Sequence, residues 1–234
     1  MQYQPFSFKI LKLKDYSYAP CMSLNKCISG LVFDKNPSND DGWTPLHNAV
    51  QNGLIGMVKT LVPQLDQKNP ESDDGITPLH LSAQEGRNRI IKYLAPFMES
   101  MNPMDDIENT PLHYAARYGH IDIVKFLMPC LQDKSPKDCI GRTPLHFAAK
   151  YGHLEVVKFL VPLLVNKNPK DLIGRTPIHL AAGKGQIKVI KYLAPKVNNA
   201  NCKDFDGLTP IRHANKEGHG DVVHYLKSLE YARS

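Results

Sequence analysis

A tetrapeptide that recurs every 33 residues constrains this chain more than any other feature of its sequence. Five copies read Thr-Pro-Leu-His or Thr-Pro-Ile-His and a sixth reads Thr-Pro-Ile-Arg; they begin at Thr44, Thr77, Thr110, Thr143, Thr176 and Thr209. A glycine stands nine residues after each threonine, and a leucine seventeen residues after it. One structural unit is therefore repeated six times, and such units bury a continuous core by stacking on their neighbours.

Each unit is predicted to form two short helices, A and B. Threonine can cap a helix, and proline suits the first helical position because its missing N–H has no partner there. In the fourth unit Gly152 is expected to end helix A. Apolar residues from Leu154 to Leu160 then recur at the spacing of one buried helical face, which predicts helix B. Pro162, nineteen residues after the threonine, is expected to end or bend helix B.

Residues 138–160 read D-x-x-G-R-T-P-L-H-x-A-A-x-x-G-H-x-x-V-V-x-x-L and resemble the ankyrin repeat. The resemblance extends over residues 34–234. It implies an all-α solenoid of stacked helix-turn-helix units with short β-hairpin-like tips and a concave face that binds proteins. The implied divisions are an N-terminal arm (1–21), a degenerate capping half-repeat (22–38) and six repeats (39–71, 72–104, 105–137, 138–170, 171–203 and 204–234), the last with the C-terminal cap.

One turn departs from the repeated pattern. Glu108 stands where the other five copies have a glycine, namely Gly42, Gly75, Gly141, Gly174 and Gly207. Left-handed backbone is strained for a residue that carries a Cβ atom, and glycine avoids that strain. We therefore expect a strained backbone at Glu108.

No catalytic set accompanies the repeats. The histidines of the tetrapeptide, His47, His80, His113, His146 and His179, lie on successive units, whereas metal ligands must converge within a few ångströms. We expect each ring to hydrogen-bond the backbone of the neighbouring turn instead. Cys139 has no histidine that the sequence places beside it, and no phosphate-binding loop or catalytic pair of carboxylates is found. These observations predict a protein that is not an enzyme, with no cofactor, metal or small-molecule substrate.

We expect a monomeric protein, and the composition favours an intracellular location, in the cytoplasm or the nucleus. No stretch of about eighteen apolar residues is present, and the first twenty residues lack the apolar block of a secretion signal. The cysteines are five, an odd number, and no two form a Cys-x-x-Cys pair. We expect free thiols in a reducing intracellular compartment.

The net charge of +6 lies entirely in the second half of the chain. Lysines recur on helix B at Lys59, Lys92, Lys125, Lys158 and Lys191. One interpretation is a solvated outer face; the alternative is a basic surface that binds anionic membrane or nucleic acid. Phe126, Phe159 and Tyr192 directly follow lysines and are expected to be partly packed, which disfavours the stacking of bases on them.

The resemblance also predicts which residues face the concavity: those flanking the turn glycine and the last two before the helix-A glycine. In the first two repeats these positions are acidic with one large aromatic: Asp40, Asp41, Trp43, Asp73, Asp74 and Glu85. In the next three they are apolar and basic, and form the predicted protein-binding surface: Ile107, Arg117, Tyr118, Ile140, Arg142, Lys150, Tyr151, Ile173, Arg175 and Lys184.

Tyr118 and Tyr151 are equivalent positions and are expected to stand side by side. Tyrosine and arginine dominate the energetics of interfaces, so we expect these repeats to bind an acidic protein segment that carries apolar anchors. The alternative is a set of unrelated surface residues, since single exposed apolar side chains are ordinary.

Overall fold

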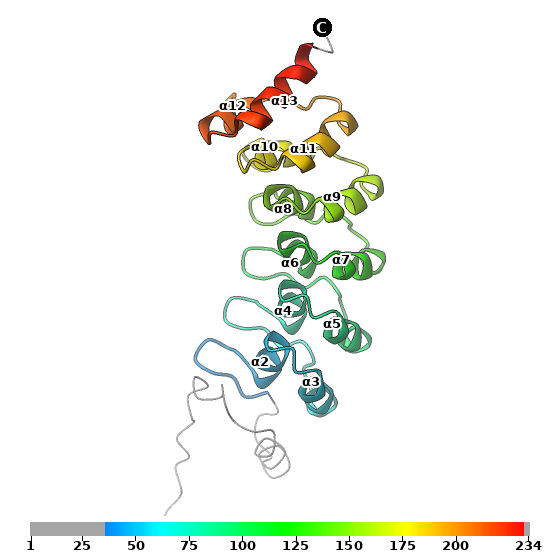
Figure 1. Cartoon of the computed structure of the whole chain (residues 1–234). Coiled ribbons are helices and arrows are strands. Elements are labelled where there is room, and N and C mark those ends of the chain that lie inside the picture. Colours follow the sequence, from blue (N-terminus) through cyan, green and yellow to red (C-terminus); the bar gives the residue numbers. More distant parts are fainter. Residues whose placement is uncertain (1–35, 232–234) are drawn as a thin grey trace, which may run out of the picture.

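The computed structural model describes residues 36–231, which form six pairs of α-helices stacked in one column (Figure 1). No strand occurs within this range, and the expected all-α solenoid is confirmed. Helix A of the successive pairs is α2 (Pro45–Gln51), α4 (Pro78–Gln84), α6 (Pro111–Tyr118), α8 (Pro144–Tyr151), α10 (Pro177–Ala182) and α12 (Pro210–Lys216). Helix B is α3 (Ile55–Leu61), α5 (Asn88–Leu94), α7 (Ile121–Leu127), α9 (Leu154–Leu160), α11 (Ile187–Leu193) and α13 (Gly220–Tyr231).

Helix A begins after the predicted threonine cap in every repeat, and in the third and fourth repeats it ends at the predicted glycine. In the fourth repeat Thr143 is the N-cap in extended conformation, Pro144 follows at the first helical position, and Gly152 ends α8 with a φ of 79°. The small side chains of Ala148 and Ala149 are completely buried between neighbouring helices. The shortest helix A is α10, with six residues, because Gly183 follows its last residue and glycine is a poor helix former.

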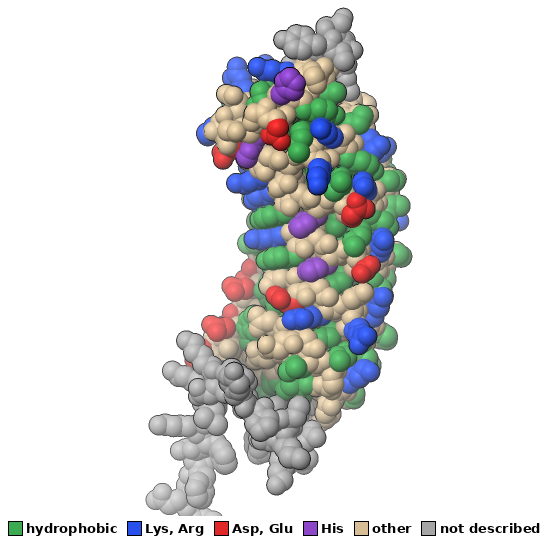
Figure 2. All heavy atoms as spheres, in the orientation of Figure 1, with side chains coloured by type: hydrophobic (Ala, Val, Ile, Leu, Met, Phe, Trp, Pro, Cys, Tyr) green, Lys and Arg blue, Asp and Glu red, His purple; other side chains and the backbone are tan. Residues whose placement is uncertain are grey.

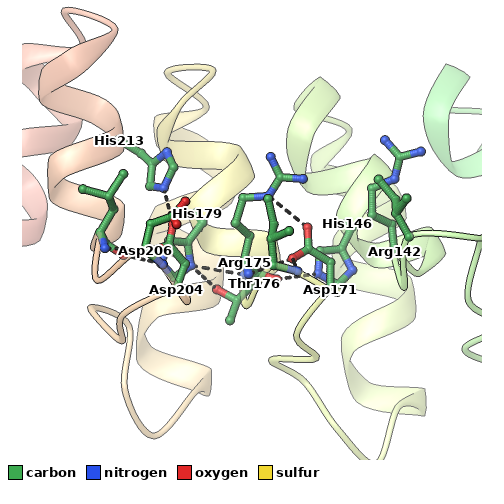
Figure 3. A network of polar contacts seen from close by, with 12 residues as sticks. Arg142, His146, Asp171, Arg175, Thr176, His179, Asp204, Asp206 and His213 are labelled. Atoms are coloured by element: carbon green, nitrogen blue, oxygen red, sulfur yellow. Dashed lines mark hydrogen bonds and ion pairs between the residues drawn. The ribbon is translucent and has the colours of Figure 1, made fainter.

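The five buried histidines bind the backbone of the next repeat, as predicted. In the fourth repeat the N–H of Thr143 donates to Nδ1 of His146 (3.0 Å), so the ring is neutral and its proton is on Nε2. Nε2 then donates to the carbonyl of Arg175 (3.2 Å), in the turn of the fifth repeat (Figure 3). The same pair of contacts is made by His47, His80, His113 and His179.

These contacts are buried in the core of the stack. Burial lowers the pKa of the histidine rings, and the hydrogen bond to the neighbouring carbonyl only partly opposes that effect. The pKa falls to about 4 for His80, His113, His146 and His179. The sixth repeat has Arg212 in place of the histidine, and there the Thr209 hydroxyl accepts the N–H of Arg212 (3.4 Å).

Helix B ends two residues before the recurring proline and continues as one turn of 3-10 helix. The turns are η2 (Val62–Gln64), η3 (Ala95–Phe97), η4 (Met128–Cys130), η5 (Val161–Leu163) and η6 (Ala194–Lys196), each with proline as its second residue. Proline has no N–H to continue the α-helical pattern. The predicted end of helix B is therefore confirmed.

The last helix, α13, packs on α11 and α12 at the end of the column (Figure 1). Its Val222 and Leu226 are buried, while Asp221 and His224 face solvent. The predicted arm (1–21) and most of the predicted capping half-repeat (22–38) lie outside the described residues. Within the described range no helix is long and apolar enough to cross a membrane, and no cluster of three or more potential metal ligands occurs.

Glu108 is the only residue other than glycine with a positive φ between residues 36 and 231, and its φ is 60°. The left-handed backbone expected at this turn is confirmed, and its strain stays a prediction. The equivalent glycines have φ values between 72° and 81°, for example 79° at Gly141. The turn of the third repeat thus keeps the geometry of its neighbours although it lacks the residue that adopts this geometry without strain.

Replacing Glu108 by glycine is expected to stabilise the protein. Removing the strain of a left-handed residue with a Cβ is worth about 1 kcal/mol, from which the greater freedom of glycine in the unfolded chain subtracts a part. The thermal midpoint, measured by circular dichroism, should rise by a few degrees. Glu108→Ala is the matched control, because it removes the carboxylate and keeps the strain. An equal rise in both variants would assign the effect to charge.

Candidate protein-binding surface

The hairpin-like turns of successive repeats are joined along one edge of the column. The two residues before the turn-glycine position of each repeat are its tip residues. From the second repeat on, the N–H of the first tip residue donates to the backbone carbonyl of the second tip residue in the preceding repeat. The pairs are Asp73 to Asp41 (3.1 Å), Asp106 to Asp74 (3.1 Å), Cys139 to Ile107 (3.1 Å), Leu172 to Ile140 (2.9 Å) and Phe205 to Ile173 (3.0 Å). These contacts form a continuous line of twelve residues, the tip row: Asp40, Asp41, Asp73, Asp74, Asp106, Ile107, Cys139, Ile140, Leu172, Ile173, Phe205 and Asp206.

The tip row changes from acidic to apolar along the column. The carboxylates of the first three turns are exposed at Asp40, Asp41, Asp73, Asp74 and Asp106. The three predicted isoleucines are exposed on the third, fourth and fifth turns, at Ile107, Ile140 and Ile173. Figure 2 shows acidic side chains at the lower left edge and alternating apolar and basic side chains above them. Trp43 is half-buried against the His47 ring (5.6 Å between centroids).

Arg117 lies between the two tyrosines that were expected to be neighbours. Its guanidinium carbon is 5.6 Å from the ring centroid of Tyr118 and 5.5 Å from that of Tyr151. The ammonium of Lys150 is 5.3 Å from the Tyr151 ring. Both rings are exposed, so cations and aromatic faces alternate across the boundary of two repeats at a distance at which they attract. We call these four residues the tyrosine cluster; their role in binding stays a prediction.

Arg142 and Arg175 are less available to a partner than the sequence suggested. Their Nε atoms contact buried carboxylates four residues earlier, at 2.7 Å from Asp138 Oδ2 and 2.9 Å from Asp171 Oδ2. The guanidinium of Arg142 also lies 4.5 Å from the Phe147 ring centroid. Each arginine therefore braces its own turn and neutralises a buried charge. The four-residue spacing of Asp and Arg across the turn was the sequence signal for this pairing.

The same buried carboxylate has a different partner in the third and sixth repeats. Asp204 contacts Nε2 of His213 (2.8 Å), as Figure 3 shows, and Asp105 accepts from the Tyr114 hydroxyl (2.8 Å). Its first oxygen also accepts turn N–H groups, such as that of Asn109 (2.7 Å). In repeats three to six the turns thus share a buried aspartate that accepts backbone N–H groups of the turn.

The tyrosine cluster does not extend into the fifth repeat. Gly183 and Lys184 occupy the positions of Lys150 and Tyr151 there, and α10 ends before both of them. Lys184 is exposed and carries a positive charge beyond the last tyrosine. It lies on the predicted surface without a ring to contact it.

Two apolar residues of the tip row were missed by the sequence analysis. Leu172 and Phe205 are among the most exposed large apolar side chains of the described chain. Both occupy the repeat position that Asp40 and Asp73 occupy in the first two repeats. Applying that position to the last two repeats would have identified them. The Lys170 ammonium lies 5.6 Å from the Phe205 ring centroid.

The lysines of helix B point to solvent on the other side of the column. Three of them lie near a ring of the following repeat: Lys59 at 5.9 Å from Tyr93, Lys92 at 5.9 Å from Phe126, and Lys191 at 5.6 Å from Tyr225. Those rings are half-buried. Phe159 and Tyr192 are half-buried too, so the expected partial packing of Phe126, Phe159 and Tyr192 is confirmed. Lys158 pairs with Glu155 (2.8 Å). Half-buried rings are poor platforms for stacked bases.

Paired helices in a column with one continuous edge of exposed turns define a repeat solenoid whose recognition surface spans several units. The family model of ankyrin repeats matches residues 21–105, 97–171 and 161–232, and the chain belongs to the ankyrin-repeat family. Ankyrin repeats generally serve as protein–protein interaction modules. No curated protein matches the chain significantly.

Proposed function

We propose that this chain is a non-catalytic scaffold that binds an acidic protein segment with apolar anchors through repeats three to five. The observation that carries this proposal is the tyrosine cluster, in which Arg117 lies between the exposed rings of Tyr118 and Tyr151. Large aromatic and arginine side chains supply most of the energy of protein interfaces when a partner excludes water from them. The exposed isoleucines of the neighbouring tips add apolar area to the same surface.

The distribution of charge supports an acidic partner. Arg142 and Arg175 form ion pairs with buried aspartates. The other cations of this surface, for which no ion pair is described above, are Arg117, Lys150 and Lys184. The acidic tips of the first two repeats would repel an acidic segment. Complementary and repulsive charges on one edge favour a single register of the partner.

We propose that the chain acts as a monomer in the cytoplasm or the nucleus. All residues of the surface come from one chain, so a second copy is not needed to complete it. The cysteines of the described range, Cys130, Cys139 and Cys202, are free thiols, and two of them are exposed. Exposed thiols are compatible with a reducing compartment.

Replacing Tyr118 and Tyr151 together by alanine is expected to weaken partner binding roughly thirtyfold, or about 2 kcal/mol, because both rings are lost from the centre of the interface. Affinity purification with the intact chain as bait would supply the partner, and calorimetry on the purified pair would give the Kd. The thermal midpoint should not change, since neither ring belongs to the buried core.

The matched control is the replacement of Asp40 and Asp73 by alanine, which should leave the Kd almost unchanged. A large loss with the aspartate pair and none with the tyrosine pair would place the binding surface in the other half of the molecule. Raising the salt concentration tests the basic-surface alternative. Binding to phosphate groups weakens steeply with salt, whereas binding to a partly apolar protein surface does not.

A further inference from the structure

Five exposed apolar side chains lie in one line on the tip row. They are Ile107 (51% exposed), Ile140 (39%), Leu172 (66%), Ile173 (48%) and Phe205 (70%). We propose that this apolar strip holds a segment of the partner in polyproline II conformation, with an apolar side chain at every third residue and acidic residues between. The inference rests on the proposed function, and extends the surface to the sixth repeat.

The strip is continuous because its turns are joined by hydrogen bonds. The N–H of Leu172 donates to Ile140, and that of Phe205 donates to Ile173. The turn glycines allow this approach: a Cβ atom at Gly174 would lie 2.6 Å from Cδ1 of the Phe205 ring. The ring therefore lies directly over the preceding turn. Contiguous apolar area of this kind marks an interaction site more often than scattered apolar residues do.

The strip is narrow. Charged residues stand within two positions of its members on both sides, as Asp106 does beside Ile107 and Arg142 beside Ile140. An amphipathic α-helix would place an apolar stripe about 100° wide on this surface, and its edges would lie over those charges. A partner that presents one apolar side chain per repeat fits the strip better.

The spacing of the repeats indicates the conformation of the partner. Packed helices lie about 8–10 Å apart, and the turns follow the helices of the column. In polyproline II every third side chain returns to the same side after about 9 Å. In a β-strand the residues on one face are about 7 Å apart, so they would lose register with the repeats after two units.

The charges beside the strip select the residues between the anchors. Lys170 lies against the Phe205 ring, and Arg117 and Lys150 lie in the tyrosine cluster. Carboxylates of the partner could contact these cations, while basic residues would meet repulsion. The acidic tips of the first repeats, such as Asp73 and Asp74, would end the bound segment.

Labelled synthetic peptides of one composition test this inference directly. Each has 22 residues, with four leucines among glutamate, alanine and serine, and the leucines stand two, three or seven positions apart. Fluorescence anisotropy with the intact chain measures the Kd. We expect the peptide with period three to bind at least tenfold more tightly than the other two. Tighter binding of the period-seven peptide would overturn the extended partner in favour of a helix, and no binding by any peptide would overturn the strip as a peptide site.

A pair of double variants then locates the site. Leu172→Ser with Phe205→Ser should weaken the period-three peptide at least tenfold. Leu163→Ser with Val165→Ser is the matched control, since both are exposed apolar residues in or just after η5, outside the tip row. That control should bind as the parent does. Equal binding by the tip variant and the parent would overturn the strip.

The failure of this inference differs from the failure of the proposed function. If the tyrosine double variant weakens binding of the natural partner and the tip variant does not, the proposed function is supported and the apolar strip is rejected as a binding site. If neither variant weakens binding of the natural partner, both the proposed function and the apolar strip are rejected. Sedimentation of the intact chain tests a further occupant: self-association that the tip variant abolishes would assign the strip to a second copy and overturn the peptide partner.

Discussion

Acidification from pH 7 to pH 4 is expected to unfold the stack. Four buried rings, those of His80, His113, His146 and His179, are neutral in the folded chain because burial lowers their pKa to about 4. Each one accepts a backbone N–H at Nδ1, so a proton at that atom would break the cap of its own helix. Protonation therefore opposes both the helix start and the contact to the next repeat.

The direction of the effect follows from the two pKa values. In the unfolded chain a histidine titrates at about 6.5, so between pH 6.5 and pH 4 the unfolded state binds more protons than the folded state. The stability that the neutral rings contribute is fully present above pH 6.5. It is lost as the pH falls through this window towards the folded pKa.

The expected size of the effect is large. A difference of 2.5 pKa units corresponds to about 3 kcal/mol for each ring, and the four rings together to roughly 12 kcal/mol. Globular proteins are stable by about 5–15 kcal/mol. Loss of this contribution should therefore be sufficient to unfold the chain before most surface carboxylates are protonated.

Denaturant unfolding at a series of pH values measures this dependence. Replacing His146 by glutamine should reduce the slope of the free energy of unfolding against pH by about 1.4 kcal/mol per pH unit near pH 5, because one proton fewer is taken up on unfolding. Lys158→Gln is the control, since it changes a surface charge and leaves the buried rings in place. A free energy of unfolding that stays constant between pH 6.5 and pH 4.5 would contradict neutral buried rings.

The sequence predicted those parts of the fold that depend on contacts inside one repeat or between equivalent positions of adjacent repeats. The threonine cap, the bond from His146 to the next turn and the left-handed backbone of Glu108 all recur at fixed offsets. A single register therefore places both partners of each contact. The same reasoning located the exposed isoleucines of the tip row.

The candidate surface was less predictable because side-chain pairing differs from repeat to repeat. The buried aspartate of the turn pairs with Arg142 in the fourth repeat, but with His213 in the sixth. The approach of Arg117 to Tyr151 depends on the rotation between two units, which the period does not specify. Sequence spacing indicates which residues share a face, and only the packed structure shows which of them already have a partner.

Deletion of the last helix, from Asp221 onward, is expected to destabilise the chain from its C-terminal end. Val222 and Leu226 are buried against α11 and α12, and burial of such side chains contributes about 1.5–3 kcal/mol each. Without α13 the apolar faces of both helices meet water. Helix α12 has only seven residues, too few for stability on its own.

Hydrogen exchange measured by mass spectrometry would show where protection is lost. In a linear stack each unit contacts only its neighbours, so exchange should accelerate by orders of magnitude in α12, less in α11, and hardly at all in α2 to α5. Leu226→Ala in the full-length chain should produce a weaker form of the same gradient, while His224→Ala, on the exposed side of the same helix, should leave exchange unchanged. A uniform loss of protection from α2 to α12 would mean that the six repeats unfold as one cooperative unit, because local fraying cannot affect a helix that lies five repeats away.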